Sequence, residues 1–207
     1  MKIFNPLLCY YPHVVGGPAN TIYWLNSALS KQKIRTSVLS TSVGLNEIEF
    51  KELKKHNSTD KFQETEFIRR NTFIYIIKSI KYIKDCDIIK FSSCFFSPTL
   101  ALIIISIICK KEIIMAPRGE LYSNALSHKA MRKKLYLIIL KKFQKKINFV
   151  ATNDIEKSII CKTFPNLKSI CTIPNFILLP TRRMKKLEKQ LVYLGRINPI
   201  KNIKSLI

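Results

Sequence analysis

The chain has 207 residues, 47% of them hydrophobic, so it can bury a sizeable core and is not a disordered polymer. Lysine and arginine outnumber aspartate and glutamate by 36 to 13, which gives a formal net charge of +23. This excess favours acidic partners, namely nucleic acid, anionic lipid headgroups or phosphorylated substrates. The alternative is that much of the charge is only a solvated surface, and composition alone leaves both interpretations open.

The cysteines and the apolar segments indicate the compartment. Six cysteines lie far apart, without a CxxC pair or a His–Cys cluster of metal-ligand spacing, and predict buried thiols in a reducing environment. The N-terminal apolar stretch is broken by Pro6 and Pro12 and has no small-residue cleavage site, so we expect a cytoplasmic protein. The most apolar window, 94–109, is shorter than the ~20 residues of a membrane span and predicts a buried helix.

Apolar, β-rich runs alternate with longer helical patterns in chain order, which is typical of βαβ units around a parallel sheet. The predicted strands are 2–8, 35–40, 87–91, 112–116, 148–152, 169–173 and 190–194. The predicted helices are 19–31, 71–84, 99–110, 125–146 and 155–163. We therefore predict an α/β fold, a Rossmann-like parallel sheet flanked by helices.

The pattern changes near the C-terminus. Residues 1–173 form the predicted Rossmann-like domain, and the basic segment 174–189 with its two prolines resembles an interdomain linker. Residues 190–207 hold one predicted strand and the start of one helix, too little to bury a core. We expect them to be a disordered stub or the truncated start of a second domain.

Two segments carry features of a phosphate site. Gly16 and Gly17 lie between the first strand and the first helix, where glycine lets the backbone approach a phosphate, although an ordinary tight turn explains them equally well. Arg196 and Lys201 follow the strand 190–194. Cationic groups at a strand-to-helix turn can neutralise a diphosphate, and the free N–H groups of the helix add to the attraction.

The strand 112–116 runs directly into a turn that carries Arg118 and Glu120. Charged side chains at the carboxyl end of a parallel strand point into the ligand crevice of such folds. The alternative is a local ion pair between these two residues that closes the turn.

The predicted helix 125–146 combines many basic residues with an apolar set, Met131, Leu135, Ile138, Ile139 and Phe143. Such a helix fits an anionic membrane surface, and it fits equally a helix packed on a sheet with its lysines in water. Zinc ligands, RNP-type aromatics and a GXXG loop are absent from the sequence, so we expect no nucleic-acid partner.

Taken together, these segments resemble the glycosyltransferase family 4 enzymes, whose GT-B fold has two Rossmann-like domains across a cleft. The matching parts follow the family's order. They are Gly16-Gly17, 87–89 with 95–98, 116–120, 151–153 with Glu156, 173–175, and 194–196 with Lys201. Members often have a histidine shortly after the strand at 87–91, where this chain has Lys90, Ser92 and Ser93. Asn202 stands where members usually have a glycine after the matched lysine. Phe176 stands where they usually have a glycine after the Pro-Asn pair.

The resemblance implies roles for particular residues. Arg196 and Lys201 would stabilise the departing diphosphate of a nucleotide-sugar donor as electrostatic catalysts, and Gly17 would offer its N–H to the same diphosphate from the Gly16-Gly17 loop. The acceptor cleft would contain Arg118, Glu120, Ser92 and Asn175. The family retains anomeric configuration and needs no metal or other cofactor, so none is expected here.

The sequence therefore predicts the acceptor-binding half of a retaining glycosyltransferase that acts on lipopolysaccharide, capsule or another surface glycan at the inner membrane face. The family's paired glutamates of the donor domain would lie beyond Ile207, so we expect little or no transferase activity from this chain alone. The alternatives are a remnant that binds an anionic lipid or a lipid-linked acceptor without catalysis, and a degraded pseudoenzyme.

Overall fold

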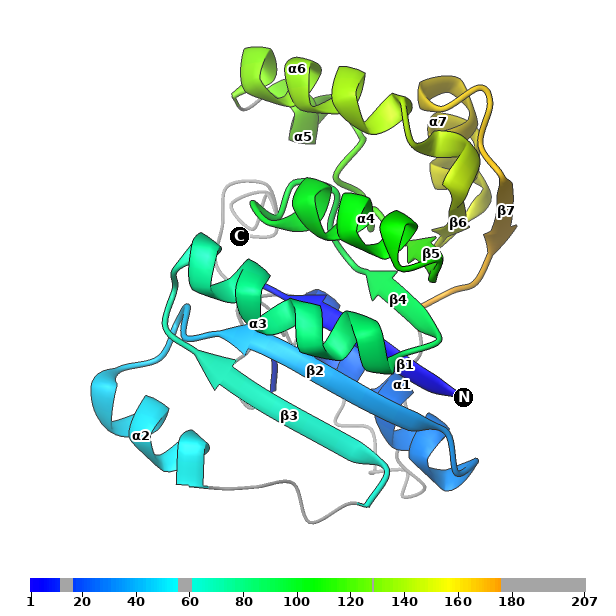
Figure 1. Ribbon diagram of the computed structural model, residues 1–207. Coiled ribbons are helices and arrows are strands. Elements are labelled where there is room, and N and C mark those ends of the chain that lie inside the picture. Colours follow the sequence, from blue (N-terminus) through cyan, green and yellow to red (C-terminus); the bar gives the residue numbers. More distant parts are fainter. Residues whose placement is uncertain (12–16, 56–60, 128, 176–207) are drawn as a thin grey trace, which may run out of the picture. The chain divides into compact units, whose positions relative to one another are not determined.

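The computed structural model describes residues 1–11, 17–55, 61–127 and 129–175, which lie in one compact unit, Met1–Ile177. Seven parallel strands of the described residues form one sheet in the order β3-β2-β1-β4-β5-β6-β7 (Figure 1). Their bounds are β1 (Lys2–Leu7), β2 (Arg35–Thr41), β3 (Gln63–Ile68), β4 (Ile88–Phe91), β5 (Glu112–Met115), β6 (Ile147–Ala151) and β7 (Ser169–Thr172). The predicted α/β class, a parallel sheet flanked by helices, is confirmed.

Helices cover both faces of the sheet. They are α1 (Gly17–Lys31), α2 (Glu47–Lys55), α3 (Thr72–Asp85), α4 (Thr99–Ile108), α5 (Ser123–Ser127), α6 (Ala130–Lys141) and α7 (Asp154–Thr163), with a 3-10 turn at Gln144–Lys146. One large core joins the sheet to α3, α4, α6 and α7, and a smaller core joins β1, β2 and β3 to α1 and α2. In Figure 1, α3, α4 and α6 lie on the near face of the sheet and α1 lies behind it.

The large core begins with a row of side chains that runs straight across four strands. Phe4 on β1 is the register partner of Ile89, which is paired with Ile113, which is paired in turn with Ile147. All four are almost completely buried. Because alternate residues of a strand share one face, this row fixes which face of each strand the helices α3 and α4 cover.

The helix α3 has a clear start signal in the sequence. The Asn71 side chain accepts hydrogen bonds from the backbone N–H groups of Phe73 at 3.0 Å and Ile74 at 3.1 Å, as a helix cap does. One turn later the fully buried Tyr75 donates its hydroxyl to the carbonyl oxygen of Leu39 at 2.6 Å and to that of Leu7 at 3.3 Å. Tyr75 therefore ties α3 to the carboxyl ends of β1 and β2.

We expect Tyr75→Phe to lower the free energy of unfolding by about 1–2 kcal/mol, because it keeps the ring but removes the hydroxyl that bonds both strand ends. Urea unfolding of the variant measures this. The matched control is Tyr122→Phe, since the Tyr122 hydroxyl lies 3.5 Å from its acceptor on Asn153 and is only partly buried. An equal loss in both variants would contradict the role assigned to Tyr75.

Several sequence predictions differ from the structure. The single helix 125–146 is wrong, because Lys129 has a left-handed backbone (φ 56°) and separates α5 from α6. The strand β3 and the helix α2 were not predicted. None of the six cysteines is in a disulfide, but only Cys86 and Cys94 are buried, whereas Cys161 and Cys171 are exposed. The predicted strand 190–194 lies outside the described residues.

Candidate functional site

The candidate site lies at the carboxyl ends of the strands. Because the sheet is parallel, the loops that follow β1, β2, β3, β4 and β5 all leave it at one edge, where ligands gather in open α/β folds. Two adjoining cavities of about 230 and 290 Å³ open among these loops, and both are lined by Leu8, Phe95 and Phe96.

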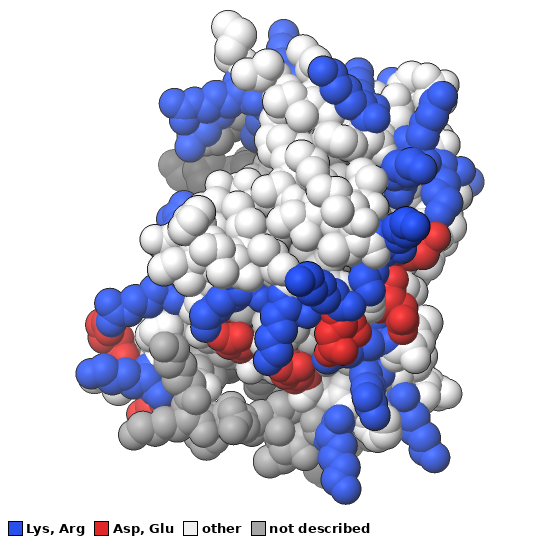
Figure 2. Space-filling model, viewed as in Figure 1, with Lys and Arg blue, Asp and Glu red and all other residues white. Residues whose placement is uncertain are grey.

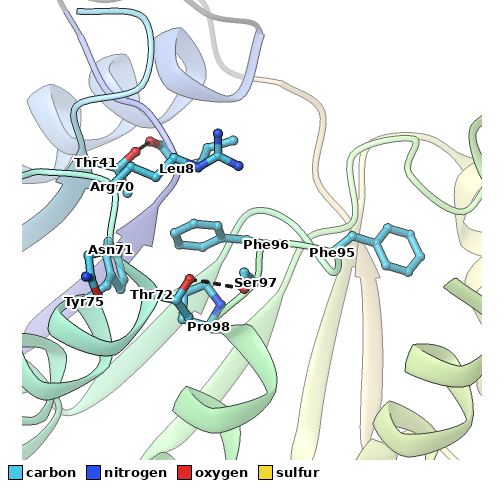
Figure 3. Close-up of a pocket in the computed structure, with 10 residues that line it drawn as sticks. All are labelled: Leu8, Thr41, Arg70, Asn71, Thr72, Tyr75, Phe95, Phe96, Ser97 and Pro98. Carbon is cyan, nitrogen blue, oxygen red and sulfur yellow. Dashed lines mark hydrogen bonds between the residues drawn. The ribbon is translucent and has the colours of Figure 1, made fainter. Parts of the chain in front are cut away.

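The first cavity, which we call the Phe96 pocket, is lined by Leu8, Thr41, Arg70, Asn71, Thr72, Tyr75, Phe95, Phe96, Ser97 and Pro98. Figure 3 shows the Phe96 ring among the lining residues, with Arg70 on one side and Thr72 and Ser97 on the other, whereas Phe95 points away. Tyr75 meets the Phe96 ring edge-on, with ring centroids 5.1 Å apart. An aromatic floor with a polar rim is suited to a sugar ring, whose C–H face packs on aromatics and whose hydroxyls need partners.

The cation of the Phe96 pocket is Arg70. Its neighbour Arg69 pairs with Glu47 at 2.9 Å, whereas Arg70 is exposed and makes no hydrogen bond or ion pair among the residues the structure describes. A free guanidinium beside an aromatic floor can bind a carboxylate or phosphate in bidentate fashion. The Phe96 pocket therefore combines features that recognise a ring and features that recognise an anion.

The second cavity brings together two of the predicted acceptor-cleft residues, Ser92 and Glu120. The Glu120 carboxylate accepts hydrogen bonds from the Ser93 hydroxyl and the Cys94 N–H, both at 2.6 Å. Burial raises the pKa of this carboxyl, while the hydrogen bonds act in the opposite direction. Glu120 therefore joins the loop after β5 to the loop after β4. The alternative that Glu120 pairs with Arg118 is wrong, since these two described residues form no ion pair.

The other two predicted cleft residues, Arg118 and Asn175, contact each other. The Arg118 Nη1 atom donates a hydrogen bond to Asn175 Oδ1, across 57 positions of sequence. Arg118 has a positive φ of 51° and is followed by Gly119 at 83°, a left-handed conformation that arginine adopts only at a cost. Such a turn places the guanidinium where the loops after β5 and β7 meet.

A buried carboxylate, Glu156 in the first turn of α7, holds this turn in place. Its Oε1 accepts the Gly119 N–H at 2.6 Å, and its Oε2 accepts the N–H and the hydroxyl of Thr152 at 2.7 and 2.6 Å. The Asn153 side chain caps the same helix by accepting the Glu156 N–H at 2.8 Å. Glu156 is only 1% exposed, so its role is to position the turn rather than to contact a ligand.

A second cation, Lys90 on β4, lies near Arg118. The Lys90 side chain is partly exposed as a whole, but its Nζ atom is buried without a hydrogen-bond partner in the described part of the chain. Burial lowers the pKa of this amine to about 7, and the Arg118 charge acts in the same direction. The Ser92 hydroxyl and the Arg118 Nε are also buried without partners. The carboxyl edge thus holds polar groups that the described protein does not satisfy.

Of the predicted donor-phosphate residues, the structure describes Gly17 alone. Gly17 is the first residue of α1, and a Cβ atom added there would meet nothing within 4 Å, so its backbone faces open space. Gly16, Arg196 and Lys201 lie outside the described residues. Within 1–11, 17–55, 61–127 and 129–175, no three His, Cys, Asp or Glu residues come together as metal ligands would.

Comparison with known proteins supports the architecture. No family model matches the sequence, and no curated protein matches it. The chain resembles the crystal structure of Arabidopsis thaliana UGT89C1 complexed with UDP-L-rhamnose, with a TM-score of 0.51 and 12% sequence identity. The match covers 91% of this chain and 55% of that one, so the chain spans about half of UGT89C1. The seven-stranded parallel sheet flanked by helices matches a GT-B half domain in fold.

No helix within the described ranges is both long and apolar enough to span a membrane.

Sequence reasoning missed Arg70 and Phe96 as pocket residues. Arg70 follows β3, and because β3 was not predicted, nothing placed Arg70 at the carboxyl edge. The signal for Phe96 was present, since the run 95–98 directly follows the predicted strand 87–91 and precedes the helix 99–110. A pair of aromatics at the carboxyl end of a predicted parallel strand identifies a candidate pocket floor.

Proposed function

We propose that this chain supplies the acceptor-binding half of a nucleotide-sugar glycosyltransferase, which moves a sugar to a glycan or lipid-linked acceptor with retention of configuration. The observation that carries the proposal is the pair of adjoining cavities at the carboxyl edge of the sheet, which share Phe95 and Phe96. The likeness in fold to a protein crystallised with UDP-L-rhamnose supports the same class.

The acceptor is assigned to the Phe96 pocket and its neighbour. The ring of Phe96 would pack against a sugar ring, and Ser92 and Glu120 border the second cavity, where hydroxyl groups of the acceptor need partners. Arg118 and Asn175 would close the same edge from the loops after β5 and β7. These groups bind and orient, since glycosyl transfer needs the acceptor oxygen held at the donor sugar.

The donor is assigned to the residues that the family resemblance selects. Arg196 and Lys201 would neutralise the diphosphate as it departs, and the open N-terminus of α1 at Gly17 would add backbone N–H groups. This chemistry needs no proton transfer from Arg196 or Lys201, because the departing group already carries the negative charge that they stabilise.

The test is binding of UDP-, GDP- and ADP-sugars to the 207-residue chain, measured by calorimetry or ligand-observed NMR. We expect one nucleotide class to bind, and Arg196→Ala with Lys201→Ala to weaken that binding at least ~10-fold, since charge-assisted bonds to a diphosphate contribute ~1.5–3 kcal/mol each. Lys51→Ala, an exposed lysine on α2, is the matched control. If no nucleotide sugar binds, or if the Lys51 variant loses as much, the donor assignment is wrong.

The acceptor assignment has its own readout. On a glycan array, Phe96→Ala should weaken binding to every glycan that the wild-type chain retains, whereas Arg70→Gln should weaken only the acidic ones. Arg69→Gln is the matched control, because Arg69 is already paired with Glu47. If acidic glycans bind the Arg70 and Arg69 variants equally, Arg70 has no part in acceptor recognition.

A further inference from the structure

The helix α6 has two apolar sides, on opposite faces. It buries Leu137 and Leu140 against the large core. Met131, Leu135 and Ile138 recur at the i, i+4, i+7 spacing of a second stripe, and they are 83%, 61% and 58% exposed. A helix that only packs on a sheet turns polar residues outward, so the outward stripe of α6 needs a separate explanation.

The neighbouring helices α4 and α3 repeat this feature. The outward side of α4 carries Ile104 and Ile108, the latter 73% exposed, and no charged residue occurs from Thr99 to Cys109. The outward side of α3 carries Phe73 and Ile77, both exposed. Because the inner sides of the three helices join one core, their outer sides all face away from the same sheet face. The exposed apolar side chains thus gather on the outer sides of three helices, whereas an ordinary exterior carries them singly.

The charges around the α4 and α6 parts of this surface have one sign, whereas α3 ends at Asp85 and its Lys78 pairs with Glu66. No aspartate or glutamate occurs at positions 88–111 or 121–153, whereas 121–153 contains eight lysines and arginines. On α6, Arg132 lies on one flank of the outward stripe, and Lys134 and Lys141 lie on the other. Figure 2 shows the uncharged area over α4 and α6 with blue side chains at its borders, whereas the red side chains lie below this area, in a row across the view, and to its right.

We propose that the outward sides of α3, α4 and α6 form a surface that docks on an anionic lipid bilayer. Apolar side chains enter the boundary between headgroups and acyl chains, and lysines and arginines on the flanks meet the anionic headgroups, as in interfacial helices. The acid-free flanks of α4 and α6 select a lipid surface of negative charge over a second copy of this chain, whose equally basic flanks would repel. This inference does not depend on glycosyl transfer.

The proposed docking surface lies on helices that begin at the candidate site. The helices α3 and α4 begin at the Phe96 pocket, which Thr72 and Pro98 line. A bilayer held against the outer sides of these helices therefore keeps the pocket beside the lipid surface. Such a position suits an acceptor that is anchored in lipid.

The test is co-sedimentation of the full chain with vesicles of phosphatidylcholine alone or with 30% phosphatidylglycerol, at 0.1 and 0.5 M NaCl. We expect binding to the anionic vesicles that weakens several-fold at the higher salt concentration, because exposed charges are screened. The triple variant Met131→Ser, Leu135→Ser, Ile138→Ser should lower the partition coefficient at least ~10-fold. All three side chains are exposed, so the variant should keep its melting temperature.

The matched control is Ile48→Ser, Ile155→Ser, Ile173→Ser, three side chains of similar exposure outside α3, α4 and α6. Its partition coefficient should equal that of the wild type. Replacing Arg132, Lys134 and Lys141 with glutamine should reduce the preference for anionic vesicles. Equal vesicle binding by the two triple serine variants overturns the proposal. The proposal is also overturned if the wild type is a dimer that does not bind vesicles and the α6 triple serine variant is a monomer.

Discussion

Replacing Glu156 with alanine is expected to lower the free energy of unfolding by about 3–5 kcal/mol, a large fraction of the stability of a domain of this size. The carboxylate is buried and accepts from the Gly119 N–H and from both donors of Thr152. Its removal leaves two partly buried backbone N–H groups, those of Gly119 and Thr152, without this acceptor. It also releases the left-handed turn at Arg118 and Gly119, which holds the Arg118 side chain beside Asn175.

Urea unfolding of the full chain measures this loss. Asp154→Ala is the matched control, because Asp154 begins the same helix but, among the described residues, its side chain accepts only from the Thr172 hydroxyl, at 3.2 Å. The control should cost no more than about 1 kcal/mol, the usual effect of an acidic side chain on a helix dipole. Glu156→Gln should fall between the two, since an amide keeps one acceptor oxygen. A loss below about 1 kcal/mol for Glu156→Ala would show that another group holds the turn.

The difference between predicted and observed elements follows from how each strand is buried. The central strands β1, β4 and β5 are covered on at least one face by the large core and appear in the sequence as apolar runs. The strand β3 lies at the edge of the sheet and contains two glutamates and only two apolar residues, Phe67 and Ile68. One of these glutamates, Glu66, accepts from the Tyr82 hydroxyl on α3 at 2.8 Å, a tertiary contact that no periodicity reveals.

The contacts of the candidate-site residues could not be predicted from the sequence either. The sequence placed Arg118 and Glu120 at the end of a strand, and the structure has them there, because the position of a turn is set locally. Their partners are set by the order of the strands. Glu120 contacts the loop after β4 and Arg118 contacts Asn175 after β7, and neither pairing can be read from spacing. Whether these residues bind an acceptor stays a prediction.

The orientation of α6 could not be predicted from the sequence. The predicted apolar set was Met131, Leu135, Ile138, Ile139 and Phe143, and the sequence left open whether it faces the sheet or a membrane. Phe143 lies after the end of α6 and is partly buried against the large core, and the other four form a stripe on the helix. The structure turns this stripe outward and buries Leu137 and Leu140 instead. Periodicity cannot choose between two apolar sides of one helix. Tertiary packing orients α6, with Leu137 and Leu140 in the large core and the Tyr136 ring 5.5 Å from the Phe95 ring.

Lys90→Met is expected to stabilise the protein by about 1–4 kcal/mol at pH 7, because it replaces a buried amine without a partner by an apolar side chain of similar length. The gain should depend on pH in a defined direction. Burial lowers the pKa of Lys90 in the folded protein from 10.5 to about 7. Between these values the unfolded chain binds one proton more than the folded chain, so the wild type becomes more stable as pH rises.

The difference between variant and wild type should therefore be largest at and below about pH 7. It should shrink by up to ~1.4 kcal/mol per pH unit toward pH 10, where the amine is neutral in both states. Urea unfolding at pH 6, 7, 8 and 9 measures the slope, with Lys51→Met as the exposed control, for which the difference should stay within about 0.5 kcal/mol. A constant difference across this range would mean that the Lys90 amine keeps its proton in the folded state. In that case an anion or water must reach it beside Arg118, at the edge where the acceptor is proposed to bind.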